Sequence, residues 1–348
     1  MTGTSSGAAA IEAAMRRALA LAATPGVPTG PNPRVGCVLL TADGAVVAEG
    51  FHRGAGTPHA EAAALAAAGD AARGTTAVVT LEPCAHTGRT GPCADALVAA
   101  GVARVVFAQS DPNPVAAGGA EVLRSAGIEV EAGLLAEESA ALNEAWTFAV
   151  TRGRPFVTWK VAATLDGRVA AADGSSRWIT SAAARADAHV LRALVGAVVV
   201  GTGTALADDA HLAVRRDGEV VAFDEQPLRV VVGERDLPST ARVLDGSAPT
   251  LHLRTHDPRE VLAALAVRDV QHVLLEGGPT LAAAFVRAGL VDAVRWYVAP
   301  ALLGAGASAL ADAGMSTISE ALRLAVTDVV RVGDDVRIDA RVVRAGEA

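Results

Sequence analysis

The sequence has few cysteines and no long apolar run, and each shortage excludes a class of protein. Three cysteines among 348 residues are too few for a disulfide framework and fit a reducing compartment, so we expect a cytoplasmic protein. No apolar run approaches the roughly 18 residues of a membrane span, and the short run that ends at Pro25 lacks the length of a secretory signal. We therefore expect no membrane partner.

Clusters of basic residues are also missing. The formal net charge is −8 at pH 7, whereas binding to a nucleic-acid backbone depends on clusters of Lys and Arg that release counterions. We therefore expect no nucleic-acid partner, although a small anionic substrate is compatible with this charge. Apolar residues make up 51% of the chain and aromatic residues only 3%, which indicates a closely packed protein built on small side chains.

The length of the chain favours two domains, each large enough to bury its own core. Short β-branched runs alternate with helical patterns in both halves, which predicts an α/β fold for each. Basic residues, a glycine and a proline interrupt this alternation at 152–155. We therefore expect one domain over residues 1–151 and a second over 152–348.

Four elements within these domains are predicted with definite limits. Apolar residues at helical spacing predict helices from about 8 to 23 and from about 136 to 150. In the second half most strands alternate with helices, which predicts a mainly parallel sheet. Strands 292–298 and 323–342 are expected to add an antiparallel edge to it, and the second of these is expected to turn back on itself at Gly333-Asp334-Asp335.

The stretch from His59 to Cys93 carries the clearest chemistry. His59 and Glu61 stand two residues apart, and Cys84 and Cys93 follow a predicted strand. One imidazole and two thiols suit a catalytic zinc, because three protein ligands leave the fourth tetrahedral position for water. In zinc deaminases an H-x-E motif precedes P-C-x-x-C, and the glutamate moves protons without binding the metal. We therefore expect zinc on the His and both Cys residues, with Glu61 as the catalytic acid and base.

The cysteine spacing departs from that signature, because eight residues separate the two thiols instead of two. The loop at 85–92 carries its own hydrogen-bond donors and could line a substrate pocket. A structural zinc in a non-catalytic module is one alternative, although a fourth ligand is missing unless His52 or His86 supplies it. A deaminase of another nucleotide, joined to an unrelated C-terminal domain, is a second alternative.

Two glycine turns follow apolar strands in the second half, at 201–204 and at 277–280. A strand, a glycine turn and the start of a helix offer free amides and a positive dipole end to a phosphate group. Neither turn fits the G-x-G-x-x-G fingerprint, and a plain structural turn is an equally good interpretation of either one alone. Together they favour a nucleotide site.

Four charged residues of the second half are candidates for substrate contact: Lys160, Arg192, Arg215 and Glu276. A solvated strand end or a surface position is the alternative for each. The remaining histidines show no ligand spacing and are expected to be structural: His189, His211, His252, His256 and His272.

The motifs in combination resemble the bifunctional riboflavin-biosynthesis deaminase/reductase family from about residue 8 to 342. The deaminase half of that family is similar to these segments: Asn32-Pro33, Val35-Gly36, Gly50-Phe51-His52, Pro58-His59-Ala60-Glu61, Thr80-Leu81-Glu82-Pro83-Cys84, His86 to Cys93, and Asp111-Pro112-Asn113-Pro114. The reductase half is similar to these: Lys160 to Arg168, Trp178-Ile179-Thr180-Ser181, Leu206-Ala207-Asp208-Asp209, and Glu276 to Leu281.

The resemblance implies a cytidine-deaminase-like α/β/α domain followed by a dihydrofolate-reductase-like α/β domain. The first would hydrolyse the 2-amino group of 2,5-diamino-6-ribosylamino-4(3H)-pyrimidinone 5′-phosphate with zinc, and the second would reduce the ribosyl chain to ribityl with NADPH. The residues implied to bind the cofactor are Ala163, Trp178, Thr204, Asp208, Gly278, Pro279 and Thr280. Those implied to bind substrate are Asn32, His52, His86, Lys160, Ser176, Arg192, Leu212, Arg215 and Glu276.

The chain departs from the family pattern at two places in the reductase half. Ala210 and His211 stand where a Pro-x pair is common, and Gly233 and Glu234 stand where the family has an Asp-Ser pair. A carboxylate at Glu234 would repel the 2′-phosphate of NADPH, so we expect a weakened preference for NADPH over NADH. A homo-oligomer, a dimer or a tetramer, is also expected, but the sequence does not determine which.

Overall fold

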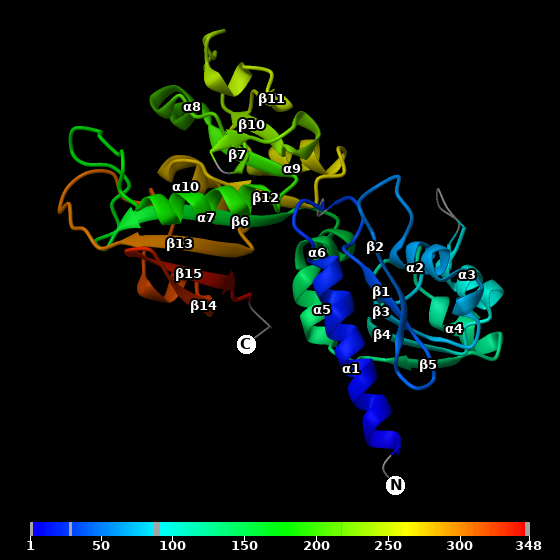
Figure 1. The fold of residues 1–348 in the computed structure, drawn as a ribbon. Helices are drawn as coiled ribbons and strands as arrows, with labels where there is room; N and C mark the ends of the chain where they lie inside the picture. The colour runs from blue at the N-terminus through cyan, green and yellow to red at the C-terminus, as the bar shows by residue number, and fades with distance from the viewer. Residues whose placement is uncertain (1–2, 28–29, 87–90, 217, 345–348) are drawn as a thin grey trace. The chain divides into compact units, whose positions relative to one another are not determined.

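The chain folds into two compact units, Met1–Gly153 and Arg154–Ala348. Both units are α/β, as the sequence predicts (Figure 1). No helix among the residues that the structure describes is long and apolar enough to cross a membrane. The structure is a computed structural model, and it describes residues 3–27, 30–86, 91–216 and 218–344.

The first unit is built on a five-stranded sheet. Its elements in chain order are α1 (Gly3–Ala22), β1 (Gly36–Leu40), β2 (Val46–Phe51), α2 (Ala60–Ala68), β3 (Thr76–Leu81), α3 (Cys93–Ala100), β4 (Arg104–Gln109), α4 (Gly119–Ser125), β5 (Glu129–Ala132), α5 (Ala136–Leu142) and α6 (Glu144–Arg152). The strand order is β2-β1-β3-β4-β5. Strand β1 runs antiparallel to β2 and β3, whereas β3, β4 and β5 are parallel.

Both faces of this sheet are buried at its centre, because β1 is buried at every position and β3 at every position after its first, rather than at alternate ones. On one face Val38 and Leu40 pack with Met15 of α1. On the other face Cys37 and Leu39 belong to the core that the sheet shares with α2, α3 and α4. The helices thus form two layers around the sheet, which gives the α/β/α arrangement (Figure 1).

Two helix predictions in the first unit need correction. The helix predicted from about 136 to 150 is two helices, α5 and α6, which meet at Asn143. The side chain of Asn143 accepts a hydrogen bond from the backbone N–H of Arg34 at 2.8 Å and donates one to its carbonyl at 2.9 Å. This long-range pairing holds the break. The first helix begins at Gly3, earlier than the expected start near residue 8.

The second unit is built on an eight-stranded sheet. Its main elements in chain order are β6 (Phe156–Thr164), α7 (Ala182–Arg192), β7 (Ala197–Gly201), α8 (Thr202–Asp208), β8 (Arg215–Arg216), β9 (Glu219–Val220), β10 (Leu228–Val232), β11 (Thr250–Leu253), α9 (Pro258–Ala266), β12 (His272–Leu275), α10 (Pro279–Arg287), β13 (Ala293–Ala299), β14 (Leu324–Val332) and β15 (Asp335–Val342). The strand order is β11-β10-β7-β12-β6-β13-β15-β14, and β8 pairs only with β9.

Successive residues of the central strands point to opposite faces of this sheet. Val199 of β7 belongs to the core that includes Leu265 of α9 and Phe285 of α10. Val198 belongs to the core that includes Leu191 of α7. The carboxyl ends of β6, β7, β10 and β12 point the same way, because these strands are parallel, and open α/β sheets bind ligands at such an edge.

The predicted antiparallel edge is only partly right. Strand β13, expected at 292–298 as part of that edge, runs parallel to β6. The reason is that α10 crosses over the sheet before β13, and such a crossover returns the chain in the same direction. The antiparallel pairing begins at β15, which forms a hairpin with β14 as the sequence predicts.

Candidate active sites of the two units

Three potential metal ligands meet beside the sheet of the first unit. His59 immediately precedes α2, Cys84 follows β3, and Cys93 is the first residue of α3. The His59 Nδ1 atom lies 3.2 Å from the Cys93 Sγ atom and 3.7 Å from the Cys84 Sγ atom. Ligand atoms of a tetrahedral zinc lie about 3.5–3.8 Å apart. The distance to Cys84 falls in this range and the distance to Cys93 is slightly shorter, so a small adjustment of these side chains would fit zinc. No other such cluster occurs within the described ranges.

The protein itself stabilises one thiolate in this cluster. A hydrogen bond from Cys93, with a further one from His59, lowers the pKa of the Cys84 thiol. The hydrogen bond to Cys84, together with burial, raises the pKa of Cys93. The backbone N–H of Cys93 also donates to the Cys84 Sγ atom at 3.4 Å. A bound cation would favour the second thiolate as well.

Glu61 lies in the first turn of α2, two residues after His59, and only 4% of it is exposed. Burial raises the pKa of its carboxyl group to about 7. A hydrogen bond with Cys93 and electrostatic coupling to Cys84 place this carboxyl group beside the ligand cluster. Because a proton-transfer group works best when its pKa is near the working pH, Glu61 is suited to accept and donate protons there.

His52 links the ligand cluster to Asn32. Its Nδ1 atom lies 3.0 Å from the carbonyl oxygen of Pro58, and a carbonyl can only accept, so Nδ1 carries the hydrogen. The Nε2 atom, 3.0 Å from the Asn32 Nδ2 atom, is then the acceptor. Both ring nitrogens of His52 are therefore engaged, which leaves neither of them for a metal. The contact also orients the Asn32 amide, so that its oxygen is the atom turned away from His52.

The loop that follows Cys84 was predicted to line a substrate pocket. His86, near its start, has a buried Nδ1 atom with no hydrogen-bond partner among the described residues. The nearby Asp111 couples electrostatically to His86, and burial raises the pKa of Asp111 to about 6. Residues 87–90 of the loop lie outside the described residues, so its role as a pocket wall stays a prediction.

Glu82 is a residue of this site whose part sequence reasoning missed. Its buried carboxylate accepts hydrogen bonds from the backbone N–H groups of Asp111, Gly118 and Ala120, at 3.2, 3.3 and 3.0 Å. These bonds tie the start of α4 to the segment that carries Cys84. The available signal was an acidic residue directly before Pro83-Cys84, where an apolar strand has just ended.

A cavity of about 1280 Å³ lies at the carboxyl ends of the parallel strands in the second unit. Ala163, a predicted cofactor contact, has a fully buried side chain in the core, and the neighbouring Ala162 lines the cavity instead. The other residues predicted for the reductase half all line it: Lys160, Ser176, Trp178, Arg192, Thr204, Asp208, Leu212, Arg215, Glu276, Gly278, Pro279 and Thr280.

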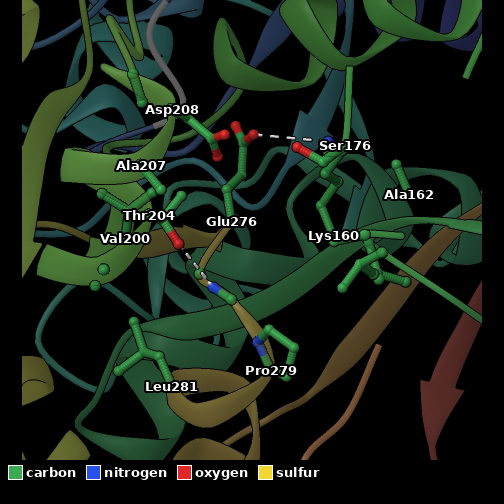
Figure 2. A pocket seen from close by; sticks show the side chains of 18 of the residues that line it. Lys160, Ala162, Ser176, Val200, Thr204, Ala207, Asp208, Glu276, Pro279 and Leu281 are labelled. Carbon is green, nitrogen blue, oxygen red and sulfur yellow. Dashed lines mark hydrogen bonds and ion pairs between the residues drawn. The ribbon is translucent and has the colours of Figure 1, made fainter. Parts of the chain in front are cut away.

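Glu276 is the centre of a charged cluster in this cavity. Its carboxylate accepts two hydrogen bonds from Arg192, at 2.6 and 2.9 Å, and lies 3.7 Å from the Lys160 ammonium group. Burial alone would raise the pKa of Glu276, but the charge and hydrogen bonds of Arg192, together with the charge of Lys160, outweigh burial and lower this pKa to about 2. Figure 2 shows Lys160 and Glu276 pointing toward each other. Two cations and one anion therefore line this part of the wall.

The two predicted glycine turns come together in space. Gly278 is the N-cap of α10, and its backbone N–H donates to the Thr204 hydroxyl group at 3.1 Å (Figure 2). Thr204 is the third residue of α8 and belongs to the other glycine turn. Both segments line the cavity, so amides at the start of α10 stand beside the hydroxyl group of the other turn.

Three histidines expected to be structural also line the cavity: His189, His211 and His256. His189 lies on α7, one turn before Arg192, and its Nδ1 atom is buried without a hydrogen-bond partner in the described part of the chain. His211 lies beside Arg215. The sequence did hold a signal for His189: it lies three residues before Arg192 on a predicted helix, so the two side chains share one face. No spacing rule connects His211 to its partners.

Comparison with known proteins assigns both halves. Residues 9–109 match the cytidine and deoxycytidylate deaminase zinc-binding region, and residues 155–338 match the RibD C-terminal domain. Riboflavin biosynthesis protein RibD of Mycobacterium tuberculosis (strain ATCC 25618 / H37Rv) is 50% identical over 311 residues, which are 88% of this chain and 90% of that protein.

Solved structures agree with this. The Acinetobacter baumannii RibD structure, form 1, has a TM-score of 0.89 at 41% identity and covers 97% of this chain and 99% of its own. A Thermotoga maritima structure of a diaminohydroxyphosphoribosylaminopyrimidine deaminase/5-amino-6-(5-phosphoribosylamino)uracil reductase has a TM-score of 0.87 at 34% identity, covering 96% and 99%.

Proposed function

The chain belongs to the RibD family of bifunctional riboflavin-biosynthesis deaminase/reductases, and we propose how its two units divide these activities. It has a zinc-binding deaminase domain and a reductase domain of the NADPH-dependent kind. We assign deamination to residues 1–151 and reduction to 152–348, which the compact units Met1–Gly153 and Arg154–Ala348 support. An unrelated C-terminal domain is excluded, because the family match covers residues 155–338.

The observation that carries the deaminase assignment is the buried carboxyl group of Glu61 beside the cluster of His59, Cys84 and Cys93. Zinc bound by these three ligands would supply a water acidic enough to act as a nucleophile at neutral pH. Glu61 would take one proton from the attacking water and give it to the ring nitrogen. It would then take the second proton from the hydroxyl group so formed and give it to the amino group, which leaves as ammonia. The amide oxygen of Asn32, oriented by its contact with His52, accepts a hydrogen bond from the substrate.

A purely structural zinc is the weaker interpretation. Structural sites close with four protein ligands, and His52 was one of two candidates for the fourth. Both nitrogens of His52 are engaged by Pro58 and Asn32. The other candidate, His86, is not part of the ligand cluster. Three ligands and a nearby acid-base group favour catalysis.

The substrate that we propose is 2,5-diamino-6-ribosylamino-4(3H)-pyrimidinone 5′-phosphate, as the description of the Thermotoga maritima protein suggests. Its deaminated product would then enter the cavity of the second unit, where NADPH would supply a hydride to the ribosyl chain. The amides at Gly278 and the hydroxyl group of Thr204 suit the cofactor phosphates. Lys160 and Arg215 suit the substrate phosphate, since both are cavity-lining cations.

The assembly and location are proposals of the same kind. Strand β14 is the last strand of its sheet, and its apolar side chains Leu324, Val326 and Val329 are exposed. An edge strand of this kind favours pairing with a second copy, so we propose a homo-oligomer, a dimer or a tetramer. Two ligand thiols require a reducing compartment, which supports a cytoplasmic location.

Replacement of Glu61 by Gln tests the deaminase assignment. Because Glu61 is not a ligand, the variant should keep its zinc and lose deamination by about 10²–10⁴-fold. Reduction of substrate that is already deaminated should continue at the native rate, because the reductase residues lie in another unit. Zinc content, ammonia release and NADPH consumption are measured on the same protein. Glu121→Gln, an exposed acidic residue on α4, is the matched control.

Near-native deamination by the Glu61 variant would mean that another group moves the proton. Loss of reduction in parallel, in a folded and zinc-loaded protein, would mean that the two activities share a site. Failure of the native protein to deaminate the proposed substrate would refute the substrate assignment itself.

A further inference from the structure

A continuous chain of hydrogen bonds runs from a buried arginine to the cavity of the second unit through His211. The Arg229 guanidinium group is fully buried and donates to the Asp245 Oδ1 atom at 3.0 Å. The Asp245 Oδ2 atom lies 2.6 Å from the His211 Nε2 atom. The His211 Nδ1 atom in turn lies 3.3 Å from the Arg215 Nη2 atom. Both His211 and Arg215 line the cavity.

The partners of His211 determine where its proton sits. Burial alone would raise the pKa of Asp245, but its hydrogen-bond donors, Ser247 first among them, outweigh burial and lower that pKa. Asp245 is therefore an ionised acceptor, and the Nε2 atom that faces it must donate. A guanidinium group only donates, so the Nδ1 atom must accept from Arg215. Only the neutral imidazole with its hydrogen on Nε2 meets both conditions.

We propose that His211 is a positioning residue that holds the Arg215 guanidinium group at the cavity wall, where it binds an anionic group of the reductase substrate. The inference rests on the proposed function, since that function assigns Arg215 to the substrate. Arg215 also donates from Nη1 to the Gly218 carbonyl at 2.8 Å. His211 adds a second hydrogen bond to Arg215 and is itself held by Asp245, which binds Arg229 of the sheet. The guanidinium group of Arg215 is therefore oriented before substrate binds.

Protonation of His211 would undo this arrangement. The charged groups around it are Asp245, Arg242, Arg229 and Arg215. Burial is the main influence on the pKa of His211 and lowers it. Asp245 raises this pKa, whereas Arg242 and Arg229 lower it, so the pKa lies below its ordinary value. The imidazole is therefore neutral at pH 7. As the pH falls through the lowered value, a hydrogen appears on Nδ1, faces Arg215 and repels it, so substrate binding should weaken in acid.

Two substitutions separate the two hydrogen bonds of His211. His211→Asn keeps an acceptor near the place of Nδ1, within reach of Arg215, and loses the contact with Asp245. His211→Gln keeps a donor near the place of Nε2 for Asp245 and loses the acceptor for Arg215. The full-length, zinc-loaded protein is assayed for kcat and KM in NADPH-dependent reduction of 5-amino-6-(5-phosphoribosylamino)uracil between about pH 5 and pH 8. Deamination by the same sample is the internal control, and Arg215→Ala is the reference.

The Gln variant should raise KM about tenfold with little change in kcat, the size expected when one hydrogen bond to a charged group is lost. It should also lose the rise in KM at acid pH that we expect of the native protein. The Asn variant should lie closer to the native KM. Deamination should not change in either variant.

The outcomes that would overturn the inference are distinct from those that refute the proposed function. If Arg215→Ala raises KM and His211→Gln does not, the positioning role is wrong and the substrate role of Arg215 stands. If Arg215→Ala leaves KM unchanged, both are wrong. An equal increase in KM in the Asn and Gln variants, together with a lowered Tm, would also overturn the inference. Such a result would indicate that His211 has a purely structural role.

Discussion

Replacement of Glu276 by Gln should destabilise the second unit by about 3 kcal/mol at neutral pH. Glu276 is buried between Arg192, which binds it through two hydrogen bonds of 2.6 and 2.9 Å, and Lys160 at 3.7 Å. The substitution keeps the shape of the side chain and removes its charge, so two buried cations lose their counterion. Burial already lowers the pKa of Lys160, so Lys160 can respond by losing its proton. Arg192 cannot, because a guanidinium group stays charged.

Two routes give the same magnitude. The lowering of the Glu276 pKa from 4.5 to about 2 corresponds to about 3 kcal/mol of stability at neutral pH. Removal of one partner of a buried ion pair typically costs about 3–5 kcal/mol, because the other charge stays buried without a counterion. The three side chains are at most 19% exposed, so solvent screening reduces neither figure much.

The pH dependence of this loss has a definite sign. Because the folded pKa is depressed, the contribution of Glu276 is fully present above pH 4.5 and is lost as the pH falls toward 2. Urea unfolding at pH 7 and at about pH 3, followed by tryptophan fluorescence, measures it. Trp159 and Trp296, whose rings lie 5.7 Å apart, report on this unit.

Glu225→Gln is the matched control, since its ion pair with Arg216 is exposed and should contribute less than about 1 kcal/mol. A loss below about 1 kcal/mol for Glu276→Gln at pH 7 would refute the reasoning. So would a loss of the same size at both pH values, because it could not come from the charge of Glu276.

Three further predictions concern metal, cofactor and packing. Cys84→Ser should empty the zinc site, so a variant that retains full zinc by elemental analysis would remove Cys84 from the ligand set. Glu234 lines the cavity, so Glu234→Ser should raise the ratio of kcat/KM for NADPH to that for NADH, and an unchanged ratio would place Glu234 away from the 2′-phosphate. A Cβ atom at Gly119 would lie 1.7 Å from the Pro83 carbonyl oxygen, so Gly119→Ala should lower the free energy of unfolding by about 1–3 kcal/mol and weaken zinc binding. Gly91→Ala meets nothing within 4 Å and should leave both unchanged.

The sequence predicted the secondary structure correctly where an element depends only on its own residues. Small apolar runs and glycine turns predicted the α/β class, and the hairpin of β14 and β15 was confirmed. The break at Asn143 was missed, because the group that holds it is the backbone of Arg34, more than a hundred positions earlier. The direction of β13 was missed because a strand's own sequence does not record which neighbour it joins.

For the candidate sites too, some features were predicted from the sequence and others required the structure. Residue type and spacing alone predicted His59, Glu61, Cys84 and Cys93, because zinc chemistry demands those donors and the chain offers few others. The raised pKa of Glu61 required the structure, since burial causes it. Likewise the engagement of both His52 nitrogens came only from the atoms that surround the ring.

By itself, then, the sequence determined the α/β class and the family to which both halves belong, and it predicted the zinc donors, because each depends on residue identity and spacing. The tertiary structure decided what each polar side chain faces. His211, expected to be structural, became part of a chain between Arg229 and Arg215 only when three separate segments were brought together. A hydrogen bond depends on distance and direction in space, and sequence separation carries neither.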